Sequence, residues 1–295
     1  MTRSNSRFDH PTGKRRDRFH SPSRGGTSEQ RPRGAHTASS RRGDTRKRLS
    51  QNFLTDPRVA AAIVRESGVG RHDLVIEIGP GRGIITRALS RRCRRVVAYE
   101  LDAGHARLVN TIFRDDPRVT CHHRDFLTTT APDEDFSIVA NIPFSRTNAI
   151  VNWCLEAPAL TSATLVTQWE YARKRTGDYG RWSRLTVLSW PHYRWSLVGR
   201  INRAKFTPVP RTDSGILRIE RRSRPLLSPA LHRRYTELVM AGFTGVGGDV
   251  HRSLRSALPL GRLRKALAHA DINQGVPVGY ISPQQWLRLT EAVGP

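Results

Sequence analysis

The sequence predicts an α/β fold, a doubly wound parallel sheet followed by a small all-helical C-terminal domain. Two observations support this prediction. Strand-like apolar runs alternate with helical patterns in the first part of the chain, as they do in βαβ units. A glycine-rich turn at residues 79–83 joins the first of these strands to a helix, which is typical of sheets that bind nucleotide-like ligands.

Seven runs have the length and the apolar character of strands. They span residues 74–78, 95–101, 119–122, 136–140, 164–168, 190–198 and 214–220. Helical patterns at 84–91 and 103–113 separate the early strands, which predicts parallel pairing. The later strands have no clear helices between them, so we expect an antiparallel addition at one edge of the sheet.

Strand patterns stop after Pro225, and short helices follow. They are expected at residues 228–241, 251–257, 261–270 and 283–293. The last of them starts with Ser282, Pro283 and Gln285 in the positions of a capping box. We therefore expect a sheet domain at 47–222 and a helical domain at 223–295.

Residues 1–46 are rich in Arg, Ser, Gly and Pro, and we expect them to form a disordered arm. Residues 1–48 hold 14 Lys and Arg against four acidic residues. This arm is either a solvated tail or a segment that holds RNA through phosphate contacts and stacking. The composition leaves both interpretations open.

The charge of the whole chain favours a polyanionic partner. The formal net charge is +25 over 295 residues, and 45 of the 50 Lys and Arg are arginines. Arginine suits phosphate through its bidentate fork and suits RNA bases through stacking. Because no apolar run could span a bilayer and no basic helix has a bulky apolar face, nucleic acid is favoured over a membrane surface. The first residues lack a secretory signal, which predicts a cytoplasmic protein.

The three cysteines predict no metal site. Cys93, Cys121 and Cys154 have neither CxxC nor Cys/His spacing, and we expect them to be reduced and structural. His122 and His123 follow Cys121 directly, but adjacent residues of a strand point to opposite faces and would not share a metal ion.

The glycine turn predicts the cofactor. Its spacing is GxGxG with Glu77 two places before the first glycine, whereas the dinucleotide fingerprint is GxGxxG. The GxGxG form after an acidic strand end is usual for S-adenosylmethionine, whose methionine part carries an amine and no pyrophosphate. This ligand needs close approach of the backbone together with carboxylate and carbonyl partners.

Polar residues follow three further strands, where the ends of an open α/β sheet line the ligand crevice. Glu100 lies 21 positions after Gly79, where a carboxylate can accept hydrogen bonds from both ribose hydroxyls of the cofactor. Asp125 is placed to reach the adenine amino group of the cofactor, with Phe126 or Leu127 against the ring. Asn141 ends the fourth strand.

Residues 141–144 have the chemistry needed to hold an extruded adenine. The adenine amino group is a weak nucleophile because its lone pair is delocalised into the ring. The side-chain carbonyl of Asn141 and the backbone carbonyl of Ile142 can accept its two hydrogens. Pro143 fixes the turn, and Phe144 offers a ring for stacking.

In combination, these motifs closely resemble the rRNA adenine dimethyltransferase family, and most closely its Erm-type 23S rRNA adenine-N(6) methyltransferases. The resemblance extends from about Arg48 to the C-terminus and rests on SQNFL at 50–54, EIGPGRG at 77–83, DFL at 125–127 and NIPF at 141–144. It implies a Rossmann-like catalytic domain and a small helical RNA-binding domain. It also implies methylation of one adenine in the peptidyl-transferase loop of 23S rRNA and resistance to macrolide, lincosamide and streptogramin B antibiotics.

The resemblance also implies roles for individual residues. The cofactor would be bound by Gln51, Asn52, Leu54, Gly79, Gly81, Glu100, Asp125 and Asn141. The target adenine would be held by Asn141, Ile142, Pro143 and Phe144. Related enzymes often continue after the aromatic with Ser or Thr and then Thr-Pro, whereas this chain continues with SRTNA and lacks the proline. We expect a monomer that acts on 23S rRNA before full ribosome assembly.

Three alternatives are considered. A small-subunit rRNA dimethyladenosine transferase commonly has leucine and tyrosine in place of Ile142 and Phe144. A DNA adenine methyltransferase usually has aspartate in place of Asn141. A non-catalytic rRNA-binding assembly factor would not need the cofactor residues, all of which are present.

Overall fold

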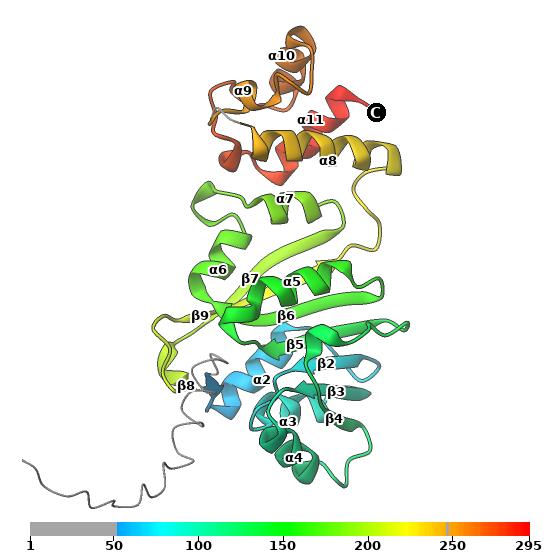
Figure 1. Ribbon diagram of the computed structural model, residues 1–295, viewed down its shortest axis with the longest axis vertical. Helices are drawn as coiled ribbons and strands as arrows, with labels where there is room; N and C mark the ends of the chain where they lie inside the picture. The colour runs from blue at the N-terminus through cyan, green and yellow to red at the C-terminus, as the bar shows by residue number, and fades with distance from the viewer. Residues whose placement is uncertain (1–51, 246–247) are drawn as a thin grey trace, which may run out of the picture. The chain divides into compact units, whose positions relative to one another are not determined.

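The computed structural model describes residues 52–245 and 248–295. The arm predicted at 1–46 and the predicted cofactor residue Gln51 lie outside these ranges. Figure 1 shows one large sheet with helices packed around it and a group of helices toward the C-terminus.

The central sheet has seven strands in the order β4-β3-β2-β5-β6-β9-β7. Five of them are parallel neighbours: β4 (Val119–His123), β3 (Arg95–Glu100), β2 (Leu74–Ile78), β5 (Phe136–Asn141) and β6 (Leu160–Gln168). Beyond β6, the strand β9 (Ser214–Arg221) pairs with it in antiparallel fashion, and the edge strand β7 (Tyr193–Ile201) is in turn antiparallel to β9. The predicted doubly wound sheet with an antiparallel addition at one edge is therefore confirmed.

Side chains alternate between two cores, one on each face of this sheet. In β2, Ile76 belongs to the core beneath α5 (Thr147–Glu156), whereas Val75 belongs to the core beneath α2 (Pro57–Glu66) and α3 (Ile84–Ser90). All five residues of β2 are buried, as expected for a parallel strand covered on both faces. The helix α4 (Ala103–Ile112) packs on Ala98 of β3 and Cys121 of β4, near the edge of the sheet opposite β7.

The expectation that no helices separate the later strands is wrong. Between β5 and β6 lies α5, and between β6 and β7 lie α6 (Trp169–Arg175) and α7 (Arg184–Ser189). Of the residues in α6, only Ala172 is buried, so an amphipathic pattern is weak there. The early helix α2 was also not predicted, and neither was the short pair β1 (Phe53–Leu54) and β8 (Phe206–Thr207).

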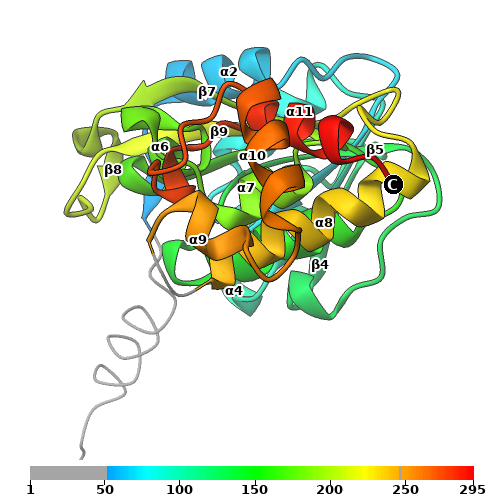
Figure 2. The same ribbon diagram turned by 90° about the horizontal axis from the view of Figure 1, so that it is seen from above.

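The helices after the sheet are α8 (Pro229–Thr244), α9 (Val250–Leu254), α10 (Leu260–His269) and α11 (Pro283–Val293). The predicted capping box of Ser282 and Gln285 is present at the start of α11. Figure 2 shows α8 and α11 beside each other, and Trp286 is fully buried in the core that these helices share.

This helical core also includes Val187 of α7, which precedes the last strands in the sequence. The hydroxyl of Tyr235 in α8 donates to the Val187 carbonyl at 2.6 Å. Figure 1 accordingly shows α7 between the sheet and the C-terminal helices. The described residues cluster as one unit, so the division at residue 222 stays a prediction. Within 52–245 and 248–295, no helix has both the length and the apolar character needed to cross a membrane.

Candidate active site

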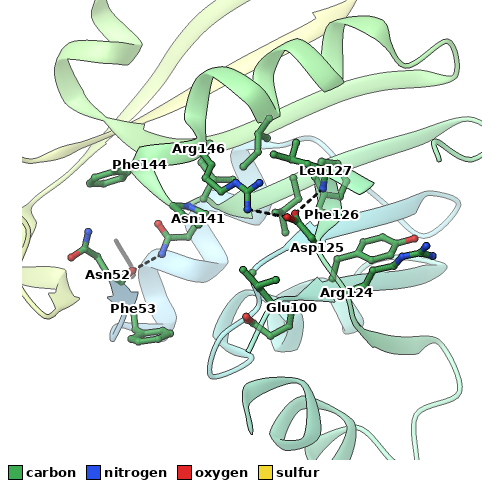
Figure 3. Close-up of a pocket in the computed structure, with 17 residues that line it drawn as sticks. Asn52, Phe53, Glu100, Arg124, Asp125, Phe126, Leu127, Asn141, Phe144 and Arg146 are labelled. Carbon is green, nitrogen blue, oxygen red and sulfur yellow. Dashed lines mark hydrogen bonds and ion pairs between the residues drawn. The ribbon is translucent and has the colours of Figure 1, made fainter. Parts of the chain in front are cut away.

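The carboxyl ends of β2, β3, β4 and β5 meet at one pocket. This edge is where open α/β sheets bind their ligands. Side chains from four strand ends and from the segment before α2 surround it (Figure 3). The lining residues include Asn52, Phe53, Gly79, Glu100, Arg124, Asp125, Phe126, Leu127, Asn141, Ile142, Pro143, Phe144 and Arg146.

The glycine turn brings the backbone close to the pocket. Gly79 has φ +66°, and a Cβ at this position would meet no atom within 4 Å, so the space beside it is open. Gly81 has φ +55°, but its Cβ would lie 2.8 Å from the ring of Phe53. The two glycines therefore have different reasons to lack a side chain. At Gly81 only glycine fits against the aromatic ring, whereas at Gly79, which lines the pocket, a methyl group would meet open space.

Glu100 is a buried carboxylate that the backbone orients. Its Oε2 accepts from the Gly81 amide at 3.0 Å and its Oε1 from the Asp102 amide at 2.9 Å. Only 1% of Glu100 is exposed. Each carboxylate oxygen has two acceptor sites, so Glu100 can still accept hydroxyl hydrogens from a bound ligand.

Glu77 lies outside this pocket and lines a smaller one beside the turn. Burial raises its pKa to about 8, with a further contribution from the negative charge of Glu100, while a 2.6 Å hydrogen bond from Thr86 works in the opposite direction. Because Thr86 belongs to the first turn of α3, this bond ties the strand to the helix across the glycine turn.

The side chain of Asp125 makes two contacts just beyond the end of β4. Its Oδ1 accepts from the Leu127 amide at 3.0 Å, which caps the short helix η1 (Phe126–Thr128). Its Oδ2 accepts from Arg146 Nη1 at 2.9 Å (Figure 3). Sequence reasoning assigned no role to Arg146, although this residue lies where the segment departs from the usual family pattern.

Asn141 is held by the segment before the first helix. Its Nδ2 donates to the backbone carbonyl of Asn52 at 2.7 Å, across 89 residues of sequence (Figure 3). A carbonyl can only accept, so this contact fixes which end of the amide faces Asn52. The Oδ1 of Asn141 is therefore directed away from Asn52 and can accept from another group.

The turn after Asn141 has one buried and one accessible side chain. Ile142 is 2% exposed and packs in the core, while Pro143 with φ −60° precedes the short helix η2 (Phe144–Arg146). Phe144 is half-buried at the pocket, with part of its ring accessible.

The structure thus brings together most of the predicted site residues. Asn52, Gly79, Glu100, Asp125 and residues 141–144 line the same pocket. Leu54 does not line it, because this side chain is 4% exposed in the core and borders only the smaller pocket. Gly81 contributes its amide to Glu100 rather than a surface to the pocket. Gln51 is not described.

Phe53 is a pocket residue that the sequence identified only as part of a motif. Its ring packs against the glycine turn, with the Arg82 guanidinium 5.4 Å from the ring centroid and the His105 ring centroid at 5.0 Å. Phe53 also pairs with Thr207 in the two-stranded ladder. Strand pairing and aromatic packing together hold the neighbouring Asn52 carbonyl in reach of Asn141.

The remaining titratable groups of the described ranges add no metal site. No cluster of three or more His, Cys, Asp or Glu that could hold a metal ion occurs in residues 52–245 and 248–295. The three cysteines are free and buried, and burial raises the pKa of Cys93 to about 11 and that of Cys154 to about 12. What the pocket offers is oriented oxygen acceptors beside aromatic and aliphatic surface, a set suited to a nucleoside.

Comparisons with known proteins agree with this chemistry. The family model described as ribosomal RNA adenine dimethylase matches residues 42–293. An rRNA adenine N-6-methyltransferase of Aeromicrobium erythreum is 46% identical to this chain, and the matched region covers 90% of this chain and 78% of the relative. An rRNA adenine N-6-methyltransferase of Streptomyces fradiae is 48% identical, and the matched region covers 85% of this chain and 79% of the relative. The crystal structure of the 23S rRNA methyltransferase ErmE matches with a TM-score of 0.80 and 46% identity, covering 82% of this chain and 99% of that one.

Proposed function

The chain belongs to the ribosomal RNA adenine dimethylase family, and we propose that it methylates the exocyclic amino group of one adenine in the peptidyl-transferase loop of 23S rRNA. Family membership makes it an S-adenosylmethionine-dependent methyltransferase, as the sequence predicted. The observation that carries the proposal is the Asn141–Asn52 contact, which orients the amide at the same pocket as Glu100 and Asp125.

The pocket fits S-adenosylmethionine. When bound, this cofactor supplies a methyl group activated by a positively charged sulfonium. Glu100 would accept hydrogen bonds from the ribose hydroxyls, and Asp125 would accept one from the adenine amino group, with Phe126 or Leu127 against the ring. The open space at Gly79 suits the close approach of the methionine part.

The residues at 141–144 would prepare the target amine. Asn141 Oδ1 and the Ile142 carbonyl accept its two hydrogens, which turns the lone pair out of conjugation with the ring. Phe144 stacks on the flipped base, and Pro143 keeps the carbonyl and the ring in one fixed turn. The contribution of these residues is positioning, and no strong base is required of them.

Two observations favour the large-subunit target over the small-subunit one. Ile142 and Phe144 stand where small-subunit enzymes commonly have leucine and tyrosine. The structure of ErmE, a 23S rRNA methyltransferase, matches over nearly its whole length. We propose macrolide, lincosamide and streptogramin B resistance as the outcome. Residues 47–222 would form the catalytic part and 223–295 an RNA-binding part of a cytoplasmic monomer that acts before full ribosome assembly.

Methyl transfer to protein-free rRNA tests the function. We expect label from S-adenosylmethionine to enter 23S rRNA but not 16S rRNA. Primer extension on 23S rRNA from cells that express the chain should then stop at one adenine of the peptidyl-transferase loop. Labelled 16S rRNA would instead support the small-subunit alternative, and no label in either RNA would support a non-catalytic assembly factor.

A further inference from the structure

Two tyrosines with exposed rings lie against arginines near the C-terminal helices. Tyr179 is 67% exposed, and the Arg173 guanidinium lies 3.7 Å from its ring centroid. Tyr280 is 43% exposed, and Arg181 both donates to its hydroxyl at 2.7 Å and lies 5.0 Å from its ring centroid. These four residues define what we call the Tyr179–Tyr280 patch.

The patch joins segments that are about a hundred residues apart in sequence. Arg181 directly precedes Trp182, whose amide donates to the Gly279 carbonyl at 2.7 Å. Gly279 directly precedes Tyr280 in the short helix η5 (Val278–Tyr280). The backbone contact therefore holds the two tyrosine-bearing loops side by side, independently of the aromatic rings themselves.

The backbone at Tyr179 is in a conformation that a bulky residue rarely adopts. Tyr179 has φ 62° and ψ 20°, between Gly177 and Gly180, which also have positive φ. Asp178 supports this turn, because its carboxylate accepts from the Tyr179 amide at 2.8 Å and from the Arg173 side chain. The turn thus maintains a strained residue whose ring is mostly exposed. Because the strained backbone at Tyr179 does not serve to bury the ring, it indicates a functional role for this residue.

The charge of this region is strongly positive. Residues 169–184 contain five Lys and Arg against two acidic residues, and both acidic residues pair with Arg173, which leaves Lys174, Arg175, Arg181 and Arg184 without an acidic partner in this segment. Exposed aromatic rings with arginine charges beside them are the combination that binds single-stranded nucleic acid. The excess of positive charge favours a polyanion over a neutral protein surface.

The segment that bears Tyr179 is also connected to the catalytic edge of the sheet. Asn141 pairs with Val166 of the neighbouring parallel strand β6, and α6 starts at Trp169, directly after that strand ends. Arg175 of α6 donates to the side chain of Asn148, four residues beyond Phe144. The loop that bears Tyr179 follows α6 and is thus anchored beside the target-binding turn.

We propose that the Tyr179–Tyr280 patch binds unpaired nucleotides that flank the target adenine, with bases stacked on the two rings and phosphates near Arg181. This inference rests on the proposed function, since it assumes an RNA substrate. It adds a contact surface outside the pocket that would help to place one adenine in the active site.

The test compares Tyr179→Ala, Tyr280→Ala and the double variant with the wild type. Binding is measured on a hairpin RNA that carries the peptidyl-transferase loop and on a fully paired duplex of equal length. We expect each single variant to weaken hairpin binding by about fivefold or more, the lower end of the effect of removing a base-stacking ring. Duplex binding and the KM for S-adenosylmethionine should not change.

Two control variants separate stacking from loss of structure. Tyr179→Phe keeps the ring and should bind the hairpin as the wild type does. Leu108→Ala removes an exposed apolar side chain of α4, 41% exposed, and should also bind normally. Photocrosslinking of the hairpin substituted with 5-bromouridine should label peptides that contain Tyr179 or Tyr280.

Unchanged hairpin binding by the folded double variant would overturn the inference. Equal losses on hairpin and duplex would overturn it as well, because they would indicate contacts with the RNA backbone alone. If the wild type binds the hairpin through these tyrosines but transfers no methyl group to 23S rRNA, the proposed function fails and the patch stands. If methyl transfer occurs and the tyrosines have no effect, only the patch fails.

Discussion

Arg146 Nη1 lies 2.9 Å from Asp125 Oδ2 in the candidate cofactor pocket, and both side chains are partly exposed, at 38% and 29%. The pair connects the end of β4 with the turn after β5, so it spans the two strand ends assigned to the cofactor and to the target base. Arg146 thereby fixes the orientation of a carboxylate that the proposed function assigns to the cofactor adenine.

We expect Arg146→Ala to raise the KM for S-adenosylmethionine by up to about fivefold, because a partly exposed ion pair contributes at most about 1 kcal/mol. Asp125→Ala should raise this KM further, since it removes the acceptor itself. Arg94→Ala, which removes an exposed ion pair with Glu134 outside the pocket, serves as the matched control. Steady-state kinetics at saturating RNA give the values, and an unchanged KM in Arg146→Ala would contradict a positioning role.

Asn141→Ala should lower the single-turnover rate of methyl transfer by roughly 100-fold, the effect of removing one oriented polar group from a transition state. The matched control is Asn110→Ala. Asn110 also binds backbone atoms through its amide, with Cys121 as its partner, but it lies outside the pocket. Circular dichroism checks that both variants fold. A folded Asn141→Ala enzyme with full activity would show that another group orients the amine.

Gly79→Ala and Gly81→Ala should fail in different ways. Both place alanine at positive φ, which costs about 1–2 kcal/mol. At Gly81 the added methyl also collides with the Phe53 ring at 2.8 Å, so we expect a larger loss of unfolding free energy. At Gly79 the methyl enters open pocket space, so we expect a folded protein with a raised KM for S-adenosylmethionine. Urea unfolding and kinetics together distinguish these outcomes, and equal stability losses would contradict the assignment.

The sequence predicted the centre of the parallel sheet well because β2 and β5 are buried on both faces. The bounds of β2 agree at both ends, since the apolar run Leu74–Ile78 is interrupted by glycine directly afterwards. The helix α6 was missed because its residues are mostly polar and aromatic and only Ala172 is buried. A single buried residue gives no periodic hydrophobic pattern that the sequence could show.

The candidate site likewise has one part that the sequence could predict and one part that it could not. Strand ends were predictable because parallel strands place their carboxyl ends at one edge. The Asn141–Asn52 and Arg146–Asp125 contacts were not, since each joins residues that only the folded chain brings together. The collision that requires Gly81 similarly depends on Phe53, which precedes it by 28 positions.

Glu77 should make the stability of the protein depend on pH. Its pKa is raised from 4.5 to about 8 by burial, so the folded state keeps a proton that the unfolded state releases. Below about pH 4.5 both states hold the proton. As pH rises from there to about 8, the free energy of unfolding should fall, by a total on the order of a few kcal/mol.

Glu77→Gln isolates this effect, because glutamine stays neutral and keeps an acceptor for the Thr86 hydroxyl. We expect the variant to be more stable than the wild type at pH 8 and to show a weaker decline between pH 5 and 8. Urea unfolding at several pH values measures both. If the two proteins decline in parallel, the buried carboxyl is not the group that titrates.

Deleting residues 1–45 should reduce the salt dependence of RNA binding. The deletion removes 11 Lys and Arg together with four acidic residues. Each phosphate contact that is lost should lower the slope of log K against log salt by about 0.7 for a single-stranded RNA. Three or more arm contacts would therefore lower the slope by at least about 2. A variant with a Gly/Ser segment of equal length in place of the arm controls for chain length and should behave as the deletion does. Parallel slopes for the full chain and the deletion would identify the arm as a solvated tail, whereas a slope restored only by the native arm would identify its arginines as RNA contacts.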